Sequence, residues 1–281
     1  MTASPSEFSR FRARPYTPVI GALIDQIDLS APLDEVARAE LRAALAHFSV
    51  LFLREQRLDA AAQVALANVF GRADGGKAYF PTAAEHALIE VIETRAGGPR
   101  YTTDQWHHDL SYLAEPPAGA VLCAVELPPA GGDTIWASGR AAYRALDPGL
   151  AARLEGLRAS HSIEHSGWPD ILRQQPDGEA RYRAIRAEHP PVSHPIVRVE
   201  PLTGDKYLFV NPKYVERIQG VSRQESDALL AQLQQQFERP EHQARLRWAP
   251  GTVAIWDNFT TAHYAVADYL PAYRRMHRVT F

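Results

Sequence analysis

A histidine and an aspartate two positions apart form the most promising pair of reactive side chains in the sequence. His107 and Asp109 lie in the segment Trp106-His107-His108-Asp109. On an extended strand, residues i and i+2 project from the same face, so both side chains could bind one metal ion. His108 would then point to the opposite face and pack or form hydrogen bonds there. The segment supplies two candidate metal ligands.

A third candidate ligand is His263, which follows the apolar strand expected at 253–257. We expect a loop after that strand to bring His263 to the pair. Two histidines and one carboxylate leave open positions on octahedral Fe(II) for a bidentate 2-oxo acid and for dioxygen. The same ligands could instead hold zinc in a hydrolase, although no glutamate accompanies them as an obvious general base.

Two arginines near the end of the sequence, Arg274 and Arg278, are candidate binding groups for carboxylates. Residues four apart on a strand face the same side, and guanidinium groups form planar, permanently charged forks. A charged edge strand exposed to solvent is the alternative interpretation. Their position shortly after His263 favours a role in the same site.

The elements that must position these residues are mostly short strands. Strand patterns occur at 50–53, 88–93, 119–127, 133–137, 194–200, 206–211, 244–248, 252–257 and 276–281, and helical patterns at 34–48, 59–70 and 222–237. No alternation of strands with crossover helices appears. The sequence therefore predicts a mainly β fold with peripheral helices, such as an antiparallel barrel or jelly roll.

The chain has 281 residues, of which 46% are hydrophobic and 22% charged, and these values fit a single globular domain over 1–281. We expect residues 1–18 to form a flexible N-terminus. The polar, proline-containing segment 164–191 shows no clear periodicity and is predicted to be an insertion or lid.

Composition excludes several classes of partner. The formal net charge of -3 provides no basic field for nucleic acid or an anionic membrane. No apolar stretch approaches the roughly 20 residues that span a bilayer, and no signal peptide is recognisable. The single cysteine, Cys123, cannot form an intramolecular disulfide. These features favour a cytoplasmic protein that binds a small molecule.

The sequence resembles the taurine dioxygenase family, which includes aryloxyalkanoate and alkylsulfate dioxygenases. The resemblance runs from about Gly21 to the end of the chain. Its motifs are Trp106 to Asp109, Pro116 to Ala120, Gly131 to Trp136, Trp256 to Asn258, His263 to Ala265, Tyr269 to Pro271 and Arg274 to Arg278. It implies a double-stranded β-helix and a dioxygenase that requires Fe(II), 2-oxoglutarate and O2.

The resemblance also implies roles for individual residues. His107, Asp109 and His263 would bind the iron, Thr134 and Arg274 the distal carboxylate of 2-oxoglutarate, and Arg278 the C1 carboxylate or an anionic substrate. Oxidative decarboxylation of 2-oxoglutarate to succinate and CO2 would accompany hydroxylation of a substrate C–H bond.

The substrate pocket departs from that of the taurine enzyme at two places. Residues 72–77 replace a segment that carries a sulfonate-binding histidine, and Thr103 replaces an asparagine. Similarity to the family marks as candidate substrate contacts Lys77, Tyr79, Thr103, Leu110, Trp168 and Arg278. We expect a small organic anion such as a sulfonate, sulfate ester or aryloxyalkanoate.

Several alternatives remain open at this stage. Desaturation or cyclisation at the same iron centre depends on the exact position of the substrate. A binding module without enzymatic activity would contain the histidines and Asp109 as structural residues. Members of the family commonly form dimers or tetramers, and we expect a homo-oligomer.

Overall fold

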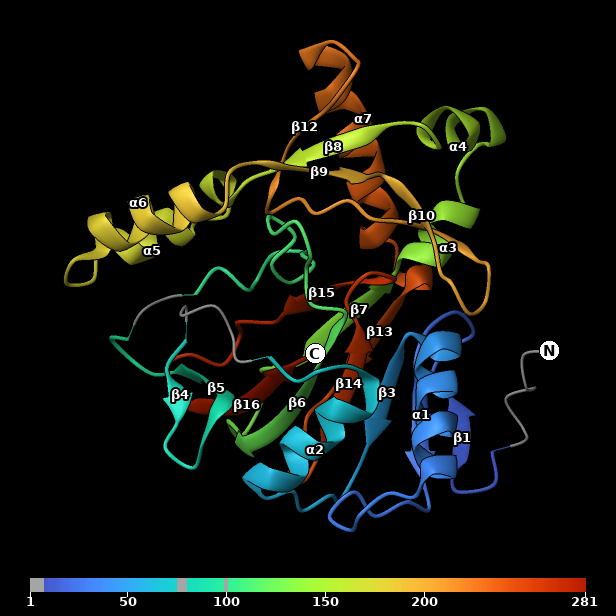
Figure 1. Cartoon of the computed structure of the whole chain (residues 1–281), viewed down its shortest axis with the longest axis vertical. Helices are drawn as coiled ribbons and strands as arrows, with labels where there is room; N and C mark the ends of the chain where they lie inside the picture. Colours follow the sequence, from blue (N-terminus) through green and yellow to red (C-terminus); the bar gives the residue numbers. More distant parts are fainter. Residues whose placement is uncertain (1–7, 75–79, 99–100) are drawn as a thin grey trace.

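Strands dominate the computed structural model, which describes residues 8–74, 80–98 and 101–281 (Figure 1). One sheet contains eight strands. Their spatial order is β1 (Arg12–Pro15), β2 (Ala22–Asp25), β3 (Val50–Leu53), β14 (Val253–Asp257), β6 (Gly119–Glu126), β16 (Arg274–Thr280), β5 (His86–Thr94) and β4 (Thr82–Ala83). All neighbours pair antiparallel except β2 and β3, which are parallel.

Three smaller sheets complete the strand structure. The one that adjoins the site has the order β13 (Gln243–Leu246), β7 (Thr134–Ser138) and β15 (Thr261–Ala265), all antiparallel. The others are β12 (Val215–Ile218) with β8 (Arg158–His161) and β9 (Val192–Pro195), and the pair β10 (Val197–Val199) and β11 (Lys206–Leu208). The prediction of a mainly β protein is confirmed.

Helices lie at the periphery. They are α1 (Glu35–Phe48), α2 (Ala60–Phe70), α3 (Gly139–Arg144), α4 (Pro148–Leu154), α5 (Trp168–Arg173), α6 (Gly178–Glu188) and α7 (Arg223–Glu238), with 3-10 turns η1 (Ile163–His165) and η2 (Pro240–His242). The side chains of Asp34, Asp59 and Ser222 cap α1, α2 and α7 by accepting backbone N–H groups, so these helices begin where the sequence patterns predict. None of the helices in the described ranges has the length and apolar character needed to cross a bilayer.

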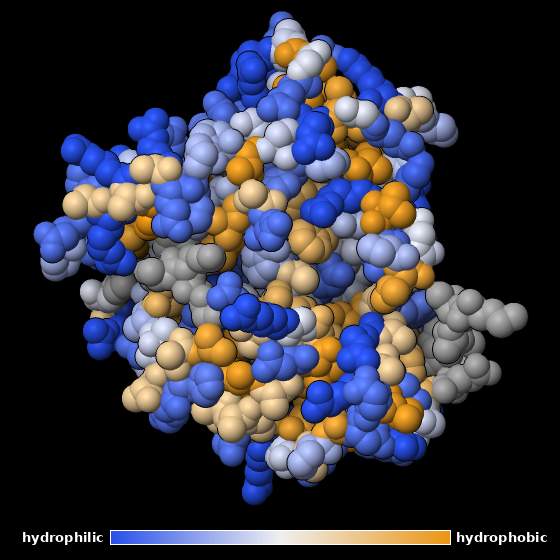
Figure 2. All heavy atoms as spheres, viewed as in Figure 1, coloured by the Kyte–Doolittle hydropathy of each residue, from blue (hydrophilic) through white to orange (hydrophobic). Residues whose placement is uncertain are grey.

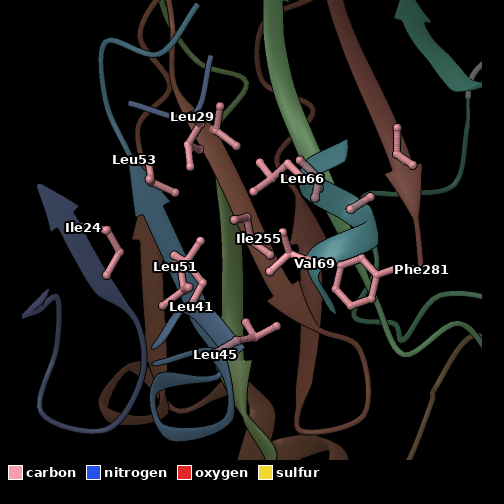
Figure 3. Close-up of a cluster of buried hydrophobic side chains, with 14 of the residues drawn as sticks. Ile24, Leu29, Leu41, Leu45, Leu51, Leu53, Leu66, Val69, Ile255 and Phe281 are labelled. Carbon is pink, nitrogen blue, oxygen red and sulfur yellow. The ribbon is translucent and has the colours of Figure 1, made fainter. Parts of the chain in front are cut away.

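Alternation along the central strands divides the core into layers. Val253 and Ile255 of β14 pack on the side covered by α1 and α2, whereas Ala254 and Trp256 face β7 and β13. Figure 3 shows the first of these layers, where Ile255 lies among leucines of β3 and of the two helices. Each fully buried aliphatic side chain contributes roughly 1.5–3 kcal/mol of hydrophobic stabilisation. The second layer lies between the two sheets and adjoins the functional site.

Two segments differ from the sequence expectation. Residues 8–18 are not a flexible tail in this structure: Arg12–Pro15 form β1, and Ser9 and Arg10 donate backbone N–H groups to Glu40 of α1. Segment 164–191 is largely helical, since it contains α5 and α6. Its large apolar residues are too few to show a period in the sequence. Trp168, Ile171, Leu172 and Tyr182 are buried in one cluster.

Hydrophilic residues, interrupted by paler orange ones, cover much of the visible side of the α5–α6 pair (Figure 2). Arg173 and Arg183 form exposed ion pairs with Glu179 there. Such pairs contribute little to stability. The inward aromatic and aliphatic side chains therefore hold this pair of helices in place.

Candidate metal centre and adjoining cavity

Three side chains converge on one buried point, as the sequence analysis predicts for His107, Asp109 and His263. One potential ligand atom from each lies within 4.8 Å of the others. Asp109 Oδ1 is 3.9 Å from His107 Nε2 and 3.7 Å from His263 Nε2. Two imidazole nitrogens and one carboxylate oxygen at this separation fit a divalent transition metal bound at one face.

The backbone brings the three residues together in a way that the sequence pattern did not predict. His107 lies in an isolated bridge with His263, in which the backbone N–H groups and carbonyls of the two residues pair at 3.0 and 2.8 Å. Asp109 follows in a turn, so the predicted continuous strand through both residues is wrong. His263 lies within β15, whereas the sequence analysis expected it in a loop. Pairing of two distant segments therefore sets the distance between the histidines.

Asn258 fixes the turn that carries Asp109. Its side chain accepts the N–H of Asp109 at 2.7 Å and donates to the carbonyl oxygens of Asp109 and Pro117, both at 2.9 Å. His108 points to the opposite face, as predicted: Nδ1 bonds to the Asn258 carbonyl at 2.8 Å, and its ring packs on Phe209. One asparagine therefore orients both residues that follow His107.

The hydrogen bonds of His107 leave a lone pair for a metal. Its Nδ1 lies 2.6 Å from the Gln105 carbonyl, which can only accept, so Nδ1 carries the proton and Nε2 is free to bind an ion. Burial, and after it the charges of His263 and Lys213, hold the pKa of His107 well below its usual range. Burial lowers the pKa of His263 to about 4. Both imidazoles are neutral at neutral pH, as metal binding requires.

The second oxygen of Asp109 is bound by a buried arginine. Arg278 Nη1 donates to Asp109 Oδ2 at 2.9 Å, and its Nε donates to Glu90 Oε2 at 2.7 Å. Burial would raise the pKa of Asp109, but Arg278 and then the two histidines hold it well below its usual range. Asp109 is therefore ionised, with Oδ1 directed at the histidines. Arg278 has two carboxylate partners within the protein.

A cavity of about 350 Å³ opens beside the candidate metal ligands. His107, His263, Thr134, Arg274 and Arg278 line it. Its remaining wall is largely apolar and includes Phe80, Ile92, Tyr101, Leu122, Trp136, Trp256, Tyr269, Leu270 and Met276. An apolar cavity with a few convergent polar groups is the usual form of a small-molecule site.

Arg274 and Thr134 present unused donors to this cavity. Arg274 is buried, and its Nε has no hydrogen-bond partner among the described residues. Its guanidinium lies 5.8 Å from the Tyr269 ring centre. Thr134 Oγ1 accepts the indole N–H of Trp248 at 3.0 Å, so its own proton remains available. Arg274 and Arg278 face the same side of β16, as their spacing predicts, with the half-buried residues 275 and 277 on the other side.

The six candidate substrate contacts lie in different places. Thr103 and Arg278 line the cavity together with the candidate ligands His107 and His263. Leu110 does not lie there but lines another cavity with Leu113 and Pro116. Trp168 lies behind the wall, with its ring 5.5 Å from that of Phe80. The remaining two, Lys77 and Tyr79, lie outside the described residues.

The sequence analysis assigned no role to Asn258, Glu90 or Lys213. Asn258 belongs to the motif Trp256 to Asn258 of the family resemblance, so this motif could have identified it as a residue of the site. Glu90 is a carboxylate between Ile89 and Val91, and a charged residue in an apolar strand indicates a buried partner. Lys213 is almost completely buried, with a relative exposure of 2%, but no sequence pattern marks it.

Comparisons with known proteins agree with this geometry. The family model described as "Taurine catabolism dioxygenase TauD, TfdA family" matches residues 12–280. The alpha-ketoglutarate-dependent sulfate ester dioxygenase of Pseudomonas putida is 36% identical over 93% of this chain and 86% of its own length. The alpha-ketoglutarate-dependent 2,4-dichlorophenoxyacetate dioxygenase of Cupriavidus pinatubonensis is 31% identical over 95% and 96%.

A solved structure is also similar. The crystal structure of a putative alpha-ketoglutarate-dependent taurine dioxygenase from Burkholderia xenovorans has a TM-score of 0.82 and 33% identity, and the match covers 96% of this chain and 92% of that one. Sequence and fold therefore agree over nearly the whole chain. The chain belongs to the TauD, TfdA family and is an alpha-ketoglutarate (2-oxoglutarate)-dependent dioxygenase.

Proposed function

We propose that His107, Asp109 and His263 bind Fe(II) and that Arg274 and Thr134 bind the distal carboxylate of 2-oxoglutarate. One observation carries this proposal: His107 and His263 line the same cavity as the buried guanidinium of Arg274, and the ligand atom of Asp109 lies within 4.8 Å of theirs. When bound, iron would couple oxidative decarboxylation of 2-oxoglutarate by O2, giving succinate and CO2, to insertion of the second oxygen atom into a substrate C–H bond.

The protein orients the reacting groups and excludes water. Neutral His107 and His263 and ionised Asp109 need no proton loss at neutral pH before they bind a cation. Arg274 and Thr134 supply a charge-assisted and a neutral hydrogen bond to one carboxylate. Aromatic side chains around the cavity keep solvent from the reacting C–H bond. These contacts define where each end of 2-oxoglutarate lies.

A single domain over 1–281 with the double-stranded β-helix fold is our proposal for the architecture. It is supported by the layer in which Trp136 of β7 packs against Trp256 of β14, so that two antiparallel sheets face each other. We also infer that 164–191 acts as a lid over the substrate. Support comes from Trp168, which reaches the cavity wall through Phe80.

The proposed substrate is a small organic anion with an apolar body, of the sulfate ester, sulfonate or aryloxyalkanoate type. The cavity wall is mainly apolar, and relatives named for sulfate esters and 2,4-dichlorophenoxyacetate cover most of the chain. Hydroxylation is the proposed outcome. Mass spectrometry of the product separates it from desaturation or cyclisation, since only hydroxylation adds an oxygen atom.

Anaerobic absorption spectroscopy tests the proposed ligands. We expect a weak visible charge-transfer band when Fe(II) and 2-oxoglutarate are both added, because the 2-oxo acid then chelates the metal. His107→Ala should abolish the band, whereas the exposed His165→Ala should retain it. A full-strength band in folded His107→Ala would contradict the proposed ligand set.

Turnover is tested by succinate formation with hexyl sulfate, hexanesulfonate and phenoxyacetate. At least one of them should raise the succinate rate above that of 2-oxoglutarate alone. We propose that the protein acts in the cytoplasm as a dimer or tetramer, and light scattering after size-exclusion chromatography measures its assembly.

A further inference from the structure

The backbone of Lys213 is fixed to the turn that carries Asp109. The side chain of Asn211 donates to the carbonyl of His108 and to the hydroxyl of Ser111, both at 2.7 Å. Its Oδ1 atom accepts the backbone N–H of Lys213 at 3.1 Å. The backbone of Lys213 therefore has a defined position relative to the candidate metal site.

The side chain of Lys213 reaches from there to the wall of the cavity. Its Nζ donates to the carbonyl of Thr102 at 2.7 Å. Thr102 lies between Tyr101 and Thr103, and both of these residues line the cavity. The carbonyl of Thr103 accepts the N–H of Ala265, the last residue of β15, at 3.0 Å. The bond from Lys213 therefore holds a stretch of the wall that also pairs with β15.

The same ammonium group lies against the first residue of α5. Its Nζ is 5.5 Å from the ring centre of Trp168. The ring of Trp168 packs on Phe80 and Tyr101 with centroid distances of 5.5 and 5.9 Å, and these two residues line the cavity. Thr102 adds a second connection, because its Oγ1 donates to the carbonyl of Ser166 at 3.1 Å. The ammonium therefore lies where the cavity wall meets the proposed lid.

A lysine in this position carries a cost. Lys213 is buried, and burial lowers its pKa to about 8 against the attraction of Asp109 and Asp104. A methionine would fill a similar volume without that cost, but it could not donate to the Thr102 carbonyl. A buried charged group that reduces stability can still select one arrangement of the segments around it. The contacts of Lys213 fit such a role.

We propose that Lys213 is a positioning residue of the active site. It holds the wall at Thr102 and the ring of Trp168 in one arrangement, so that a bound substrate keeps its C–H bond at the metal. The inference rests on the proposed function. Lys213 acts through these neighbours, and the cations that line the cavity, Arg274 and Arg278, stay available to bound anions. Misplacement by about 1 Å can cost about 100-fold in rate, so a loosened wall would separate 2-oxoglutarate decarboxylation from substrate oxidation.

Hydrogen exchange measured by mass spectrometry on the anaerobic Fe(II)–2-oxoglutarate enzyme tests the first part of the proposal. The wall peptide covers residues 101–106 and the lid peptide residues 162–173. Lys213→Met removes a hydrogen bond to a charged group and should speed exchange in both peptides by about 10- to 100-fold. Exchange in β3 and β14 should stay at the parent rate, since the whole fold is not destabilised.

The coupling of the two half-reactions tests the second part. The probes are hexyl sulfate, hexanesulfonate and phenoxyacetate, and mass spectrometry measures the amount of oxidised probe formed per succinate. Lys213→Met should lower this ratio by at least about 3-fold for a probe that the parent oxidises. The visible band of the Fe(II)–2-oxoglutarate complex should stay unchanged. A merely structural role would reduce the amount of folded enzyme and leave the ratio unaltered.

Matched variants identify the contact responsible. Lys213→Arg retains a charged donor and should exchange more slowly than Lys213→Met in both peptides. Thr102→Val keeps the shape of the side chain but removes the bond to Ser166, so it should speed exchange in the lid peptide. Lys206→Met removes an exposed lysine paired with Glu155 and should behave as the parent does in both measurements.

Two results would overturn the assignment. One is exchange of the wall and lid peptides in folded Lys213→Met within about 2-fold of the parent, and this result decides whether or not a probe is oxidised. The other is an unchanged ratio of oxidised probe to succinate in that variant. Failure of the proposed function appears differently, as absence of the visible Fe(II)–2-oxoglutarate band in the parent.

Discussion

Replacing Arg278 with methionine tests whether this arginine stabilises the metal site from within the protein. The substitution leaves Glu90 Oε2 and Asp109 Oδ2 without the donors that lie 2.7 and 2.9 Å away. Side-chain exposure is 2% for Glu90 and 9% for Asp109, so water compensates poorly. Breaking a buried pair by removing one partner costs about 3–5 kcal/mol. We expect the unfolding free energy of metal-free Arg278→Met to fall by that amount.

A double variant makes the cause specific. In Glu90→Leu/Arg278→Met, one of the two orphaned carboxylates is gone, so about 1–3 kcal/mol of the loss should be recovered. Urea unfolding with a chelator present measures the free energy of unfolding of Glu90→Leu, Arg278→Met and the double variant. Agreement between tryptophan fluorescence and far-UV circular dichroism checks two-state behaviour. Arg14→Met removes an exposed ion pair with Asp25 and should change stability by less than about 0.5 kcal/mol.

Additive losses of stability would contradict this pairing of Arg278 with Glu90. If the losses of unfolding free energy in Glu90→Leu and Arg278→Met simply sum in the double variant, Arg278 does not stabilise the carboxylate of Glu90.

Three further outcomes are expected. Asn258→Ala should weaken Fe(II) binding about 10- to 100-fold in a competition titration with a chelator, because the Asp109 turn loses its hydrogen bonds. Arg274→Leu should weaken 2-oxoglutarate binding about 10- to 100-fold by calorimetry, whereas Arg275→Leu on the other face of β16 should not. The free energy of unfolding of the parent protein should rise between about pH 8 and 10.5, because over this range Lys213 keeps its proton in the unfolded chain but has lost it in the folded one. Melting curves at several pH values measure this rise, which should be absent in Lys213→Met.

Local patterns in the sequence predicted the helices α1, α2 and α7 and the central strands, but not the helices α3 to α6. The caps at Asp34, Asp59 and Ser222 set helix starts to within a residue. Strands such as 50–53 and 253–257 are apolar enough to be recognised because both of their faces are buried. Short edge strands such as β1 and β4 were missed, since their residues are partly exposed and carry no period.

The candidate ligands could be identified from residue type and family motifs, but their geometry could not. Whether His107 and Asp109 share a face depends on the bridge to His263 and on the bonds from Asn258, which are contacts across about 150 positions of sequence. Spacing alone predicted a strand there and was wrong. Instead of a strand, a turn held by the distant Asn258 brings the side chain of Asp109 to that of His107.

Charge pairing is the other property that spacing does not reveal. Arg274 and Arg278 are equivalent on a strand diagram, four residues apart on one face of β16. In the structure their roles diverge, because β5 places Glu90 opposite Arg278 and no carboxylate of the described chain pairs with Arg274. An arginine bound by two carboxylates stabilises the site, and an unpaired one can bind a ligand.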